Sequence, residues 1–201
     1  MDSEDSELAL LEARWRRSGE RADLLAWLRA RHEAGGLEAE RVELAAALGH
    51  GVAREARAAV DLPELESDLR DWVIGLERWG IEPCVRAALV AVRFLTDADP
   101  DQACRRAAAI GALETLLACP CDEHEKAARV AWTDDAAWAA EVPWSEFAAE
   151  VAWNARWKVH SEDEVREAIR RDLLAWALDA PVRPWDASGT WGEGRTPSPE
   201  E

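Results

Sequence analysis

The chain has 201 residues, enough for one sizeable domain with a core of its own, and 48% of them are hydrophobic and 32% charged. This balance is typical of folded globular proteins and excludes a wholly disordered chain. The formal net charge of −17 repels phosphate backbones and anionic lipids. It therefore disfavours nucleic acids and membranes as partners and favours a protein with a basic surface.

The sequence contains no signal for export or membrane insertion. It has no apolar run long enough to span a bilayer, and residues Met1–Asp5 lack the basic and apolar regions of a signal peptide. We therefore expect a cytoplasmic protein. In that reducing compartment the four cysteines are expected to stay free, without structural disulfides.

Helical periodicity begins near the N-terminus. Apolar residues recur three and four positions apart in four segments, glycines close the second and third of these, and Pro63 breaks the pattern after the fourth. The four predicted helices are Glu7–Arg17, Leu24–Gly35, Leu37–Leu48 and Val52–Val60.

The rest of the chain carries stronger helix signals. Pro100 is placed to open a long helix and Pro120 to end it, while Ser161 and Glu164 form a capping box, in which each side chain pairs with the backbone N–H of the other residue. The helices predicted here are Leu65–Trp79, Pro83–Val92, Pro100–Leu117, Cys121–Trp138, Ser145–Ala155 and Ser161–Trp176.

These patterns predict an all-α fold, because no segment alternates apolar and polar residues between hairpin turns. We expect an irregular multi-helix bundle or a short helical-hairpin solenoid of about nine or ten helices. Residues 1–180 are expected to form a single domain, with a candidate sub-boundary near residues 61–63. Residues 181–201 cannot bury enough apolar surface to offset the entropy of ordering, so we expect a disordered tail.

The segment Cys119–His124 carries the sharpest chemical pattern in the chain. Two thiols and an imidazole fall within one turn and the start of a helix, and these are ligands that soft metal ions prefer. Cys119, Cys121 and His124 are therefore candidate metal ligands, with zinc as the candidate ion.

The same segment also has a purely structural interpretation. A closed zinc site needs a fourth ligand, for which the sequence offers only Cys84 or Cys104. Cysteine also behaves as a small buried hydrophobe, and Pro120 would then simply occupy the first position of a helix. Both interpretations stay open at this point.

No catalytic motif accompanies the cysteine segment. His124-Glu125 begins like the zinc helix of metalloproteases, but Ala128 stands where the second histidine is needed. The chain has neither a Gly-x-Ser-x-Gly elbow nor a phosphate-binding glycine-rich loop. We therefore assign no catalytic residue and favour a protein that is not an enzyme.

Tryptophan is the dominant aromatic residue, with 12 Trp against two Phe and no Tyr. Several lie between residues 132 and 157, in alanine-rich sequence. They either fill the core between closely packed helices or form an exposed patch that anchors a partner. The candidate partner-binding residues are Trp144, Trp153, Arg156 and Trp157.

Several segments resemble groups of bacterial proteins. The chain is similar to uncharacterised all-helical proteins of myxobacteria and their relatives at Leu11–Trp15, Glu43–His50, Gly75–Gly80 and Ala118–Cys121. Arg105–Ile110 and the helix after it resemble part of the immunity proteins of bacterial toxin systems, although the Ala-Trp pair expected after such a segment is missing here. This second resemblance implies a helical protein that neutralises a toxin by binding it.

The sequence thus favours a non-enzymatic acidic helical protein that binds a basic protein partner, as an immunity-type or adaptor protein. Two alternatives remain. One is a helical-repeat scaffold in a larger assembly, and the other is a metal or redox protein that uses the Cys-Pro-Cys-x-x-His turn.

Overall fold

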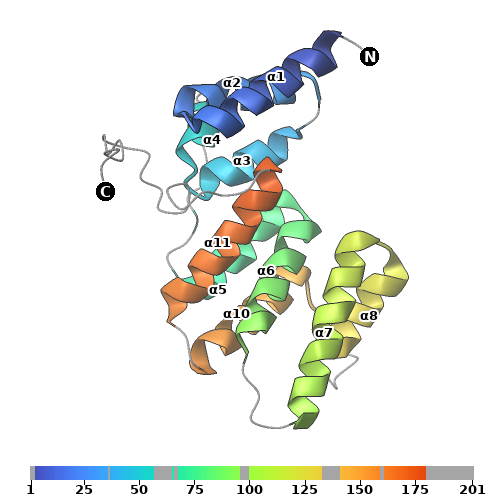
Figure 1. Ribbon diagram of the computed structural model, residues 1–201. Coiled ribbons are helices and arrows are strands. Elements are labelled where there is room, and N and C mark those ends of the chain that lie inside the picture. Colours follow the sequence, from blue (N-terminus) through green and yellow to red (C-terminus); the bar gives the residue numbers. More distant parts are fainter. Residues whose placement is uncertain are drawn as a thin grey trace. The chain divides into compact units, whose positions relative to one another are not determined.

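The computed structural model describes residues 3–35, 37–56, 65, 68–95, 100–132, 141–158 and 161–179. In these residues the chain forms ten α-helices and one 3₁₀-helix and no strand, which confirms the predicted all-α fold (Figure 1). The tail predicted to be disordered, residues 181–201, lies outside them. Within the described ranges, every helix is too short or too polar to cross a membrane.

The chain divides into two compact units. The first comprises Met1–Pro63 and Leu174–Glu201, and the second comprises Glu64–Leu173. Residues 61–63, the candidate sub-boundary, are outside the described residues, so the expectation of a single domain stays a prediction.

The first unit contains four of the helices and the last residues of α11. The indole rings of Trp15 and Trp27 stack with centroids 5.0 Å apart, and this stack joins the first two helices. Beside it, the buried carboxylate of Asp23 accepts a hydrogen bond from Ser18 and pairs with Arg14 at 2.7 Å, so its charge is compensated. The bounds are α1 Ser3–Ser18, α2 Arg21–Glu33, α3 Ala39–Ala47 and α4 Gly51–Ala56.

The second unit is built around α6, Ile81–Phe94. This helix buries nine residues between Pro83 and Val92, more than one face can carry, because it packs against both α10 and α7. The other elements are α5 Leu69–Ile74, the 3₁₀-helix η1 Gly75–Trp79, α7 Pro100–Ala118, α8 Asp122–Trp132, α10 Trp144–Lys158 and α11 Glu162–Leu178, of which the last residues belong to the first unit.

The single helix predicted over Leu65–Trp79 is wrong. The α-helix begins only at Leu69, where Asp68 caps it by accepting hydrogen bonds from two backbone N–H groups, and at Gly75 it gives way to η1. In a 3₁₀-helix, residues three apart lie on the same side. Leu76 and Trp79 are accordingly both buried.

The two predicted helix-start signals with specific chemistry are confirmed. Pro100 is the first residue of α7. Before α11, the Ser161 backbone N–H donates to the Glu164 carboxylate at 2.8 Å, and the Glu164 N–H donates to the Ser161 hydroxyl at 3.2 Å. This is the reciprocal pair of a capping box.

We expect truncation of Phe147 to identify the core of the second unit. Its side chain is 1% exposed, so Phe147→Ala should lower the free energy of unfolding by about 3–5 kcal/mol through lost burial and a cavity. The matched control Val130→Ala removes a side chain that is 46% exposed and should change stability by no more than about 0.5 kcal/mol. Urea unfolding followed by circular dichroism measures both, and equal losses would contradict this assignment of the core.

Candidate functional site

The turn between α7 and α8 is short and well determined by its backbone hydrogen bonds. The Cys119 N–H donates to the Thr115 carbonyl at 2.9 Å, which extends the helical pattern one residue beyond α7. Pro120 has no N–H to continue it. The Cys121 carbonyl then accepts from the Glu125 N–H at 2.9 Å, so Cys121 is the N-cap residue of α8, which begins at Asp122.

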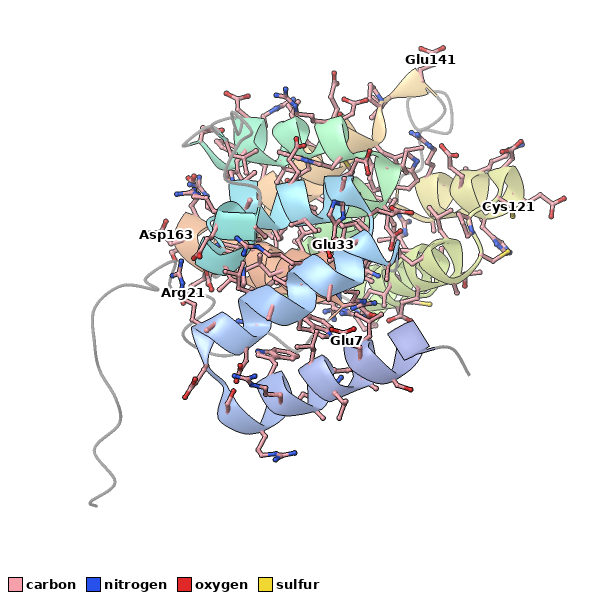
Figure 2. The ribbon with its side chains drawn as sticks, turned by 90° about the horizontal axis from the view of Figure 1, so that it is seen from above. Glu7, Arg21, Glu33, Cys121, Glu141 and Asp163 are labelled. Atoms are coloured by element: carbon pink, nitrogen blue, oxygen red, sulfur yellow. The ribbon has the colours of Figure 1, made fainter. Side chains whose placement is uncertain are left out.

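This turn brings the three predicted metal ligands together. One ligand atom from each of Cys119, Cys121 and His124 lies within 4.8 Å of the other two. Both cysteines are exposed and the histidine is half-buried. Figure 2 shows Cys121 at the tip of the hairpin formed by α7 and α8. The cluster is therefore open to ions from solvent.

The structure rejects part of the structural interpretation of this segment. Cys119 and Cys121 are exposed, so neither is a small buried hydrophobe. Pro120 lies two residues before α8 begins, so it is not the first residue of that helix. Among the described residues, the cluster contains neither Cys84 nor Cys104, and it therefore lacks the fourth protein ligand of a closed site.

Cys84 is chemically different from the other three cysteines. It lies in α6, is 0% exposed, and its Sγ donates to the Gly80 carbonyl at 3.6 Å. Burial, together with the negative charge of Glu77, raises the pKa of the Cys84 thiol to about 12. Because the thiolate is the reactive form, this thiol should be inert in the folded protein.

Thiol labelling at pH 8 tests this difference. Cys104, Cys119 and Cys121 are exposed and should react quickly with a disulfide reagent, whereas Cys84 should react only after unfolding in urea. The count should rise from three to four on unfolding, and in Cys84→Ala it should stay at three. Fast reaction of four thiols in the folded protein would contradict the burial of Cys84.

Trp144, predicted to bind a partner, lies in the core. Its side chain is 3% exposed, and its ring meets Phe147 edge-to-face at 5.1 Å. The indole N–H donates to the Glu125 carboxylate at 2.9 Å, and the Arg129 guanidinium lies over the ring at 4.5 Å. All its favourable contacts are thus made within the chain, and its burial does not support a partner-binding role.

The other candidate partner-binding residues are less constrained. Trp153 is half-buried in α10. The side chains of Arg156 and Trp157 lie outside the described residues, although their backbone belongs to α10. For these three residues the role remains a prediction.

A groove that the sequence analysis missed lies beside the cysteine turn. It has a volume of about 240 Å³ and is formed by the start of α6, the end of α7 and the start of α8. Its apolar lining is supplied by Ile81, Val85, Leu116, Leu117 and Pro120.

Three carboxylates also line this groove, which we call the acidic groove. They belong to Glu82, Asp122 and Glu125, and no basic residue lines it. Ile81 is 54% exposed directly after Gly80, whose φ of +95° favours glycine. In the sequence, an apolar residue after a glycine is only a weak signal of a groove, because the fold alone shows which helices lie around Ile81.

The first unit contains a larger hollow of about 450 Å³ between α1, α2 and Asp179. Its two arginines are each paired with a lining carboxylate, Arg16 with Glu12 at 2.5 Å and Arg31 with Asp179 at 2.6 Å.

Comparisons with protein-family models, curated proteins and solved structures each gave no match for this chain. Its function is therefore inferred from its own residues.

Proposed function

We propose that this chain is a non-enzymatic acidic protein that binds a basic protein partner through the acidic groove, as an immunity-type or adaptor protein. The supporting observation is the lining of this groove, which combines an apolar surface with three carboxylates and no basic residue.

The apolar surface supplies the attraction at short range. Ile81 leaves more than half of its side chain in solvent, although Val85 and Leu116 beside it are almost fully buried. Covering Ile81 with an apolar side chain of the partner would remove this surface from water, at a gain of about 25 cal/mol per Å². At 240 Å³ the groove is smaller than the roughly 300 Å³ at the lower end of small-molecule sites. A side chain of a protein fits it better than a cofactor.

Charge selects the kind of partner. Of the three carboxylates that line the apolar surface, Glu82 already pairs with Arg86 and Glu125 with Arg129. The attraction therefore comes from the exposed Asp122 and from the net charge of −17 of the whole chain. Cationic residues next to the inserted side chain would therefore be attracted, and the long-range field would raise the association rate at low ionic strength. This attraction should weaken with salt, because the Debye length is only about 8 Å at physiological ionic strength.

The immunity-type reading rests on the sequence resemblance at Arg105–Ile110. This segment lies in α7, whose last turns supply Leu116 and Leu117 to the groove. A toxin domain with a basic surface is accordingly the first class of partner to test.

Affinity purification from the native cell tests the proposal. The tagged protein should retain a basic partner in stoichiometric amount at low salt and lose it at high salt. Ile81→Ala should weaken this complex at least tenfold, or about 1.4 kcal/mol, as expected for a central interface residue. The control Val130→Ala, which truncates another exposed apolar residue outside the groove, should not.

A charge-reversal pair separates the groove from the general field. Asp122→Lys and Glu33→Lys change the net charge equally, but Asp122 lines the groove and Glu33 is an exposed residue of α2. Only Asp122→Lys should weaken the complex strongly. Equal losses for the two variants, or the absence of a stoichiometric partner at low salt, would contradict the proposal.

A further inference from the structure

We propose that Cys119, Cys121 and His124 bind one zinc-type metal ion, with a fourth position left for water or another external ligand. The site adjoins the acidic groove, because Cys121 also lines that groove, but all three of its ligands come from one turn of this chain.

The three donors have the right chemistry and nearly the right spacing. Two thiolates and an imidazole with an open fourth position form a known type of zinc coordination. Zn–S bonds of about 2.3 Å and Zn–N bonds of about 2.0–2.1 Å in a tetrahedron place the ligand atoms roughly 3.5–3.8 Å apart. The ligand atoms here lie within 4.8 Å of one another. Metal binding would therefore require the exposed side chains of Cys119 and Cys121 to turn toward the His124 ring.

The histidine is already oriented for metal binding. His124 Nδ1 lies 2.8 Å from the Cys119 carbonyl oxygen. Because a carbonyl oxygen only accepts hydrogen bonds, Nδ1 is the donor in this contact, which leaves Nε2 as the ring nitrogen that would bind a metal. A backbone carbonyl that holds the other ring nitrogen is the usual support of a metal-binding histidine. Here that carbonyl belongs to another ligand of the same site, so one residue both donates a thiolate and positions the imidazole.

The surroundings favour a cation. Asp122 and Glu123 are exposed in the first turn of α8, directly between the ligands in sequence. Their charges attract a divalent ion and offset its charge. A hydrated ion reaches the site directly, because Cys119 and Cys121 are exposed.

Cobalt titration of the purified, fully reduced protein tests the site. Co²⁺ should bind with a stoichiometry of one and give thiolate-to-cobalt charge transfer with the visible bands of tetrahedral coordination, and Zn²⁺ should displace it. Cys119→Ser, Cys121→Ser and His124→Ala should each lower the affinity for Co²⁺ at least tenfold. Loss of a residue that only hydrogen-bonds to a metal ligand already lowers metal affinity by about tenfold or more, so loss of a ligand should cost no less. Cys104→Ser, which changes an exposed cysteine outside the cluster, should bind like the unmodified protein.

Three outcomes would contradict the assignment. If Co²⁺ binds without charge transfer, or if Cys104→Ser loses affinity as strongly as the three ligand variants, the proposed site is wrong. Cu⁺ that binds at this turn and is not displaced by excess Zn²⁺ would overturn the zinc assignment. Circular dichroism of each variant checks the fold. Metal binding is measured here on the protein alone, so its failure is distinct from the failure of partner binding.

Discussion

Glu125 accepts hydrogen bonds from the Trp144 indole and from the Arg129 guanidinium, and this shared carboxylate holds α8 against the start of α10. The side chain of Arg129 is only 13% exposed, so the contacts lie in a partly dry environment where charge-assisted hydrogen bonds are strong. Both proposed sites depend on this contact. The cysteine turn precedes α8 directly, and Glu125 itself lines the acidic groove.

The strong acidity of the chain and its internal ion pairs act at different ranges. Arginines in the described part of the chain pair with nearby carboxylates, as Arg86 does with Glu82 at 3.1 Å and with Asp172 at 3.5 Å. Such exposed or half-exposed pairs add little stability each. They do remove positive charge from the surface potential, which leaves the carboxylate excess behind the net charge of −17. In the proposed binding, the resulting field would govern the approach of a partner, and the apolar lining of the groove would govern how long it stays.

Sequence reasoning succeeded where the signal is local. The capping box at Ser161 and the proline at Pro100 depend on a few neighbouring residues, and so does the meeting of Cys119 with Cys121 and His124. It failed where tertiary contacts decide. The apolar stripe over Leu65–Trp79 did not reveal the change from α5 to η1, and the core position of Trp144 follows from contacts with residues on α8. The acidic groove brings together three segments, so no single stretch of sequence encodes it.

The first turn of α8 also limits how this hairpin could vary in evolution. Each residue of an α-helix advances the chain by about 100° around the axis. Adding or deleting a single residue between Asp122 and Glu125, inside the first turn of α8, would therefore rotate the rest of that helix by this angle relative to the cysteine turn. Glu125 would then point away from Trp144, and Ala128, which is fully buried, would turn outward. The first turn of α8 is thus intolerant of length change, although Asp122 and Glu123 are exposed.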